Sequence, residues 1–123
     1  MKILVVDDEE SMTDFLKVEL EEGCSDLEVI VKNTGYEALN RIMQGDINLV
    51  ITDIAMPDMD GYELFHRTQE YDENIPVIMM TGFGYDPNHA VVKSRQEGLT
   101  DVLFKPFDVS KLFDLIKLRT QGE

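Results

Sequence analysis

The stretch Asn48-Leu49-Val50-Ile51-Thr52-Asp53 and the loop Ile54–Gly61 that follows it give the clearest indication of the fold. Its apolar residues run without polar alternation, which is typical of a strand covered on both faces in a parallel sheet. In the loop, Pro57 fixes the backbone, and Asp60 is a good N-cap for a following helix. The segment therefore predicts a buried strand, a rigid loop and a helix, which is one βα unit.

The same unit recurs along the chain, which predicts a sheet of five parallel strands. The four other strand-like runs lie at residues 3–6, 27–31, 77–80 and 101–104. Five helices are expected, at about residues 10–22, 34–44 and 86–98, and from residues 60 and 108 onward. The second strand-like run is the most polar and is expected at or near an edge of the sheet. Five βα units in a right-handed wind make a doubly wound α/β sheet.

Aromatic side chains are expected to pack onto this sheet. In the first helix, Phe15 shares a core-facing spacing with Leu16 and Leu20. At the other end of the chain, Phe104 and Phe107 are expected to pack the last strand and the last helix onto the sheet.

Size and composition limit the class of protein. With 123 residues, 43% of them hydrophobic, the chain can bury one core, so a single domain over residues 1–123 with no effector domain is expected. No apolar stretch approaches the roughly 20 residues of a membrane span, and the first apolar run is too short for a secretory signal. A cytoplasmic protein without membrane contact is therefore predicted. Cys24 is the only cysteine, which excludes an internal disulfide.

The charge balance is strongly acidic. The 11 Lys and Arg residues stand against 25 Asp and Glu residues, which gives a formal net charge of −14. Affinity for nucleic acid depends largely on cations that neutralise phosphates, so direct nucleic-acid binding is not expected. The acidity fits either a partner with a basic face or a surface that is merely soluble.

Polar side chains stand where four of the predicted strands end. They are Asp7 and Asp8, Asp53, Thr81, and Lys105. Because the carboxyl ends of parallel strands meet at one edge of the sheet, these side chains are expected to lie close together. Three carboxylates, a hydroxyl and an ammonium group suit a divalent metal and a phosphoryl group. Asp53 is a candidate for a third metal ligand or for a nucleophile, since carboxylates form acyl phosphates.

The pattern resembles the receiver domain of response regulators in two-component phosphorelays, over essentially the whole chain. The matching segments are Val5–Glu9, Asp53–Gly61, Met80–Gly82 and Phe104–Phe107. The resemblance implies a flavodoxin-like fold with strand order 2-1-3-4-5. It also implies a phosphoacceptor signalling domain. Its partners would be a histidine kinase or histidine phosphotransfer domain and a downstream protein target or effector domain.

The resemblance also implies roles for single residues. Asp53 would accept the phosphoryl group. Asp8 and Asp53 would bind Mg²⁺ directly, with the backbone carbonyl of Ala55, and Asp7 would act mainly through water. Such a domain catalyses only its own phosphorylation and slow dephosphorylation, so it is not a free-standing enzyme.

In the resembling family, phosphorylation changes the surface around the fourth helix, the fifth strand and the fifth helix. Thr81 and Lys105 would contact the phosphoryl oxygens, and an aromatic residue three positions before the lysine would rotate. That position is Val102 here, which predicts a smaller rearrangement. Ala55 and Phe83 would flank the phosphoryl group. An apolar pair offers no group to orient water, which predicts a long-lived phosphoryl group.

Three alternatives stay open. One is a Mg²⁺-dependent phosphohydrolase with an aspartyl nucleophile, although Ala55 occupies the position where such enzymes place a second acid–base Asp. Another is a flavin-binding module of the same fold, whose phosphate-cradling loop would replace the acidic run Asp7–Glu10. The third is a degenerate receiver used only as a binding module.

Overall fold

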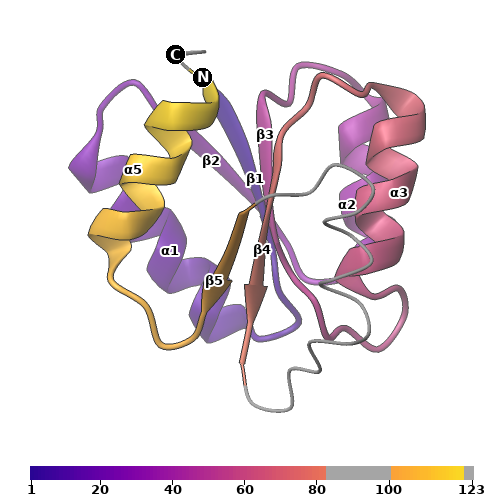
Figure 1. Cartoon of the computed structure of the whole chain (residues 1–123), viewed down its shortest axis with the longest axis horizontal. Coiled ribbons are helices and arrows are strands. Elements are labelled where there is room, and N and C mark those ends of the chain that lie inside the picture. Colours follow the sequence, from indigo (N-terminus) through magenta and orange to yellow (C-terminus); the bar gives the residue numbers. More distant parts are fainter. Residues whose placement is uncertain (83–100, 121–123) are drawn as a thin grey trace.

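The sheet expected from the sequence is present in a computed structural model that describes residues 1–82 and 101–120 (Figure 1). The strands of the described residues are β1 (Lys2–Val6), β2 (Glu28–Lys32), β3 (Leu49–Asp53), β4 (Val77–Thr81) and β5 (Asp101–Phe104). All neighbouring strands pair in parallel, in the order β2-β1-β3-β4-β5. The predicted doubly wound topology is confirmed, and β2 lies at an edge as expected.

The continuous apolar runs are explained by burial on both faces of the sheet. Every residue of β3 and β4 is buried. The register places Ile51 of β3 between Val5 of β1 and Ile78 of β4, and all three side chains are fully buried. The edge strand β2, in contrast, has only one buried residue, Val29. Burial on both faces therefore accompanies the lack of polar alternation in the central strands.

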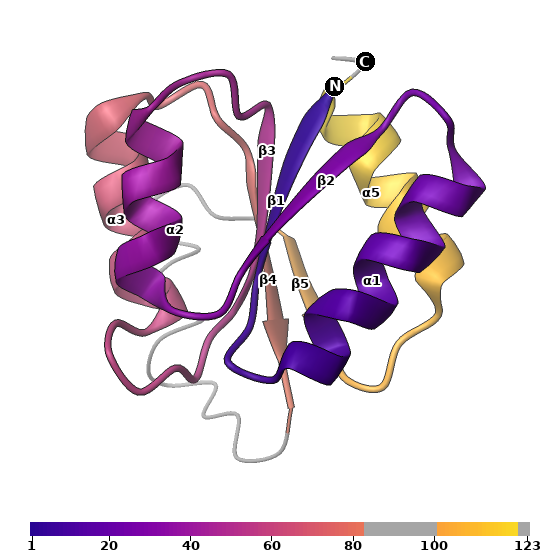
Figure 2. The same cartoon turned by 180° about the vertical axis from the view of Figure 1, so that it is seen from behind.

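Two helices cover each face of the sheet within the described residues (Figures 1 and 2). These helices are α1 (Glu10–Gly23), α2 (Gly35–Met43), α3 (Gly61–Tyr71) and α5 (Val109–Thr120). One core lies under α1 and α5, and a second core lies under α2 and α3. The helix expected at residues 86–98 lies outside the described residues. None of the described helices combines the length and the apolar character that a bilayer crossing requires.

Local sequence signals fix the helix ends next to the loops of interest. Thr34 caps α2 and accepts a hydrogen bond from the Glu37 amide at 3.1 Å. Asp60 caps α3, as predicted, and accepts from the Glu63 amide at 2.7 Å. These caps satisfy backbone donors that have no partner within the helix.

Two of the aromatic expectations are wrong. Phe15 is 50% exposed, because α1 buries the row Thr13, Leu16 and Leu20 and leaves Phe15 on its flank. Phe104 is 51% exposed. Successive residues of a strand point to opposite faces, so Phe104 lies on the face opposite the buried Leu103, at the end of β5 beyond the partly buried Val102. Phe107 is partly buried against the core under α1 and α5, as expected.

Candidate functional site

The carboxyl ends of β1, β3, β4 and β5 carry the candidate residues at one edge of the sheet. Asp7 and Asp8 follow β1, Asp53 is the last residue of β3, and Thr81 is the last residue of β4. One carboxylate oxygen from each of the three aspartates lies within 4.8 Å of the others. Lys105 follows β5, and its backbone amide donates to the Thr81 carbonyl at 2.7 Å. The structure thus brings these residues to one place.

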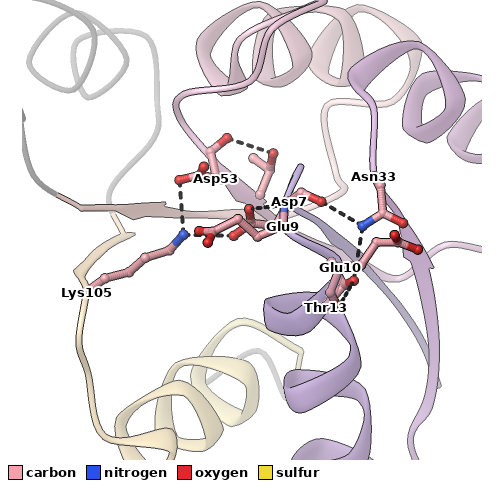
Figure 3. A network of polar contacts seen from close by, with 8 residues as sticks. Asp7, Glu9, Glu10, Thr13, Asn33, Asp53 and Lys105 are labelled. Atoms are coloured by element: carbon pink, nitrogen blue, oxygen red, sulfur yellow. Dashed lines mark hydrogen bonds and ion pairs between the residues drawn. The ribbon is translucent and has the colours of Figure 1, made fainter.

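Lys105 is the cation between two of the carboxylates (Figure 3). Its Nζ lies 2.7 Å from Oδ2 of Asp7 and 3.5 Å from Oδ1 of Asp53. Burial alone would lower the pKa of Lys105, but the hydrogen bond to Asp7 and the attraction of both carboxylates outweigh burial and raise it. The amine is therefore a permanent positive charge at this site, held more tightly by Asp7 than by Asp53.

Asp7 is completely buried, and both its carboxylate oxygens and its carbonyl accept hydrogen bonds. Its Oδ1 accepts a hydrogen bond from the Glu9 amide at 3.0 Å, and its Oδ2 accepts from Lys105. Its carbonyl accepts from Nδ2 of Asn33 at 2.8 Å, and the same Nδ2 lies 3.1 Å from Oγ1 of Thr13 (Figure 3). Neither Asn33 nor Thr13 is among the site residues predicted from the sequence. The signal for Thr13 was a hydroxyl on the buried row of α1, whereas no signal marked Asn33.

Asp53 carries the most perturbed carboxylate of the site. Only 7% of the residue is exposed, and its pKa is raised from 3.8 to about 6, with burial as the largest cause. The nearby charge of Asp7 contributes to this rise, whereas Lys105 opposes it. Thr52 donates a hydrogen bond to the carbonyl of Asp53 at 3.0 Å. An ionised Asp53 is therefore poorly compensated in the metal-free protein, which favours capture of a positive group.

Backbone hydrogen bonds hold the start and the end of the loop that follows Asp53. The Ile54 amide donates to the Met80 carbonyl at 2.9 Å, and the Gly61 amide donates to the Ile54 carbonyl at 2.7 Å. A β-carbon at Gly61 would overlap the Asp53 carbonyl, so this approach requires glycine. Ala55 follows directly and is exposed. Ala55 is thus separated from Asp53 by one residue, whose amide and carbonyl are both bonded.

The donor set suits a hard divalent cation. Carboxylate and carbonyl oxygens are the ligands that Mg²⁺ prefers, usually with several waters retained. Asp8 is exposed, while Asp7 and Asp53 are buried, so a bound ion would lie between the protein and solvent. This arrangement of oxygens fits Mg²⁺ at the site.

An apolar cavity of about 490 Å³ lies beside Lys105. The lining residues are Met12, Phe15, Gly82, Lys105, Pro106 and Phe107. The exposed Phe15 is thus part of this cavity wall. Because Phe15 was predicted to lie in the core, this cavity was not predicted from the sequence.

Val102 and Phe83 were also predicted to take part in the response to phosphorylation. Val102 is partly buried and packs against the core under α2 and α3. Phe83 lies outside the described residues. The Lys105–Pro106 peptide bond that leads from β5 toward α5 is cis.

Comparison with known proteins agrees with this geometry. A family profile described as the response regulator receiver domain matches residues 3–117. The uncharacterized transcriptional regulatory protein YkoG of Bacillus subtilis is 35% identical over 123 residues. That alignment covers 98% of this chain and 52% of YkoG. The chain therefore spans about half the length of that relative.

Solved structures give the same result. A crystal structure of a response regulator receiver domain protein from Clostridium thermocellum has a TM-score of 0.89 at 28% identity and covers 98% of this chain and 94% of that one. The solution structure of the beryllofluoride-activated NtrC4 receiver domain dimer has a TM-score of 0.86 at 32% identity, covering 98% and 97%. Because the profile spans nearly the whole chain and the fold matches these receivers, the chain belongs to the response regulator receiver domain family of two-component systems.

Proposed function

We propose that Asp53 accepts a phosphoryl group from the phosphohistidine of a histidine kinase or a histidine phosphotransfer domain. The observation that carries this proposal is a buried carboxylate at a strand end, with two further carboxylates within 4.8 Å and the amine of Lys105 at 3.5 Å. The family membership favours this function over a free-standing phosphohydrolase, a flavin-binding module or a module that only binds partners.

The pKa of Asp53 suits a nucleophile at neutral pH. With a pKa of about 6, the carboxylate is mostly ionised at pH 7 yet more basic than an ordinary aspartate. An oxygen of Asp53 forms the new bond to phosphorus, and the phosphorus–nitrogen bond of the phosphohistidine breaks. The imidazole nitrogen leaves with the electron pair of that bond. Transfer of this kind depends mainly on alignment and charge stabilisation.

In this proposal, the Lys105 amine moves from the Asp53 carboxylate to the negatively charged oxygens of the phosphoryl group. Its contact with Asp7 is short, at 2.7 Å, and its contact with Asp53 is longer, at 3.5 Å. Asp7 can therefore keep the amine at the site while the amine turns to a phosphoryl oxygen on Asp53. Thr81 is the second group assigned to a phosphoryl oxygen, and its backbone is tied to that of Lys105.

Asp8, Asp53 and the Ala55 carbonyl would hold Mg²⁺ in this proposal. Both oxygens of Asp7 already accept hydrogen bonds, from Glu9 and Lys105, which supports a contact through water for Asp7. When bound, the ion would neutralise negative charge between the carboxylates and the incoming phosphoryl group.

The proposed output is a change at the surface formed by β5, α5 and the helix expected at residues 86–98. Val102 replaces the usual aromatic and is already partly buried, so the rearrangement is smaller than in receivers with an aromatic there. Ala55 and Phe83 lack a group to orient an attacking water, which gives a slow self-catalysed dephosphorylation. The domain thus turns over its own phosphoryl group and no separate substrate.

The proposed donor docks at the edge of the sheet that carries Lys105. The apolar cavity lined by Met12, Phe15 and Phe107 opens beside the amine, and it suits an apolar helix face next to a phosphohistidine. The downstream partner is a protein target or an effector domain, in keeping with the transcriptional regulators among the relatives. We place this signalling in the cytoplasm, without direct contact with nucleic acid or membrane.

Intact-protein mass spectrometry tests the proposed function. After incubation with acetyl phosphate, the chain should gain one phosphoryl group, only when Mg²⁺ is present. The Asp53→Asn variant is the matched control and should gain none. A Mg²⁺-dependent adduct that persists in the variant, or no adduct in the wild-type chain, would overturn the proposal.

A further inference from the structure

A carboxylate outside the strand-end cluster joins the loop after β3 to a different helix. Asp58 is exposed and belongs to the loop that carries Ala55. Its Oδ1 accepts a hydrogen bond from the Gly35 amide at 3.0 Å, and its Oδ2 accepts from the Tyr36 amide at 2.9 Å. Both amides belong to the first turn of α2. The bonded residues are 23 and 22 positions apart in sequence.

We propose that Asp58 is a positioning residue for the metal site, because it fixes the loop that aims the Ala55 carbonyl. This inference rests on the proposed function in one respect, namely that the Ala55 carbonyl is a Mg²⁺ ligand. Asp58 itself would not contact the ion. It would act through the backbone between residues 55 and 58.

The hydrogen bonds to Asp58 help to satisfy the backbone amides of the first turn of α2. The first three amides of α2, those of Gly35, Tyr36 and Glu37, all have oxygen acceptors, two on Asp58 and one on Thr34. A carboxylate at a helix N-terminus also faces the positive end of the helix dipole. Burial opposes ionisation, but the bonds from Tyr36 and Gly35 together hold the pKa of Asp58 below its usual value.

Packing reinforces the same junction. A β-carbon at Gly35 would lie 2.6 Å from Cβ of Met59 and 3.0 Å from its carbonyl oxygen, so the loop touches the α2 backbone directly. Met59 is 2% exposed and Met56 is 8% exposed. Two buried methionines therefore flank the segment of loop that Asp58 ties to α2.

The Ala55 carbonyl depends on these anchors at its two ends. On one side, the Ile54 amide and carbonyl are bonded to Met80 and Gly61. On the other side, the path continues through Met56 to Asp58. Ala55 lies between these anchors, and its own side chain is a single exposed methyl group. Loss of the Asp58 bonds would widen the range of directions of this carbonyl and weaken its contribution to metal binding.

Magnesium affinity of three variants tests the inference. Asp58→Ala removes both bonds, whereas Asp58→Asn makes the same charge change and keeps one acceptor oxygen. Asp72→Ala is the matched control. Asp72 is another exposed aspartate that accepts a backbone amide, from Asn74 at 2.9 Å, but it follows α3 at the opposite end of the sheet. The chain has no tryptophan, so titration calorimetry with MgCl2 is the appropriate measurement.

The Kd for Mg²⁺ should rise about tenfold in Asp58→Ala, as for other outer-shell partners of metal sites. It should rise less in Asp58→Asn and stay unchanged in Asp72→Ala. The NMR order parameter of the Ala55 and Met56 amides should also fall in Asp58→Ala, from about 0.85 for a rigid backbone. Circular dichroism confirms that each variant is folded.

Several results would overturn the inference. Equal weakening in Asp58→Ala and Asp58→Asn would show an effect of charge alone. An unchanged Kd with a lower melting temperature would show that Asp58 serves only to cap α2. No Mg²⁺ binding by the wild-type chain would remove the site altogether. A wild-type chain that binds Mg²⁺ but takes no phosphoryl group would contradict the proposed function and leave the comparison of Kd values decisive for Asp58.

Discussion

Replacing Asp53 with asparagine should make the metal-free protein more stable at neutral pH. The folded protein holds the pKa of Asp53 at about 6, against 3.8 ordinarily, so the charged carboxylate is disfavoured by folding. Each pH unit of difference is worth about 1.4 kcal/mol. The free energy of unfolding should therefore rise by about 2–3 kcal/mol in Asp53→Asn at pH 7.5. This gain already includes the favourable contact with Lys105, because Lys105 contributes to the pKa.

The stability difference between Asp53→Asn and the wild-type protein should depend on pH. A carboxyl with a raised folded pKa favours folding fully below the unfolded pKa of 3.8, and this benefit is lost as the pH rises through about 6. Asparagine does not titrate, so the advantage of Asp53→Asn should be greatest above pH 6 and should disappear near pH 4.

Urea unfolding followed by circular dichroism measures this difference directly. Both proteins would be unfolded at pH 7.5, 6, 5 and 4 in the presence of a chelator. Addition of Mg²⁺ should then stabilise the wild-type chain and narrow the gap, by about 2.7 kcal/mol at a concentration of 100 times Kd. An Asp53→Asn protein that is less stable at pH 7.5, or whose gain is the same at every pH, would contradict the raised pKa of Asp53.

Three further substitutions have expected outcomes. Lys105→Met should lower the free energy of unfolding by about 3 kcal/mol, because it leaves the buried Asp7 without its cation; a urea midpoint close to that of the wild type would contradict this. Gly61→Ala should cost about 1–3 kcal/mol and weaken Mg²⁺ binding, because its β-carbon overlaps the Asp53 carbonyl; calorimetry and urea unfolding measure both effects, and an unchanged protein would show that the loop shifts freely. Ala55→Asn should speed the loss of the phosphoryl group, since the amide can orient water. Time-resolved intact mass measures the rate, and an unchanged rate would count against the proposed role of Ala55.

The architecture is predictable because two simple patterns agree with each other. Unbroken apolar runs such as Leu49–Thr52 indicate strands buried on both faces, and parallel strands bring their carboxyl ends to one edge. These two patterns are enough to place Asp7, Asp53 and Lys105 at the same edge of the sheet. The order of the strands, in contrast, follows from the resemblance to receivers and not from the runs themselves.

Contacts between distant segments could not be predicted in this way. The bond of Asp58 to α2 depends on the angle of a loop, and the bond of Asn33 to Asp7 depends on one rotamer. Nothing in the order of residues marks either one. Phe15 shows a related limit of prediction. The helical spacing of apolar residues predicts which face of α1 is buried, but it does not fix whether a residue at the border of that face is buried or exposed. The nearer approach of Lys105 to Asp7 than to Asp53 is likewise a matter of side-chain geometry.

The position of the phosphoryl group on the chain decides whether Asp53 is its acceptor. Reduction of an acyl phosphate with borohydride converts the modified aspartate to homoserine, which tandem mass spectrometry identifies in a peptide. After treatment with acetyl phosphate and Mg²⁺, homoserine is expected at residue 53 and at neither Asp7 nor Asp8. Homoserine at either of those positions, or a phosphoryl group on a histidine or serine with residue 53 unmodified, would contradict this expectation.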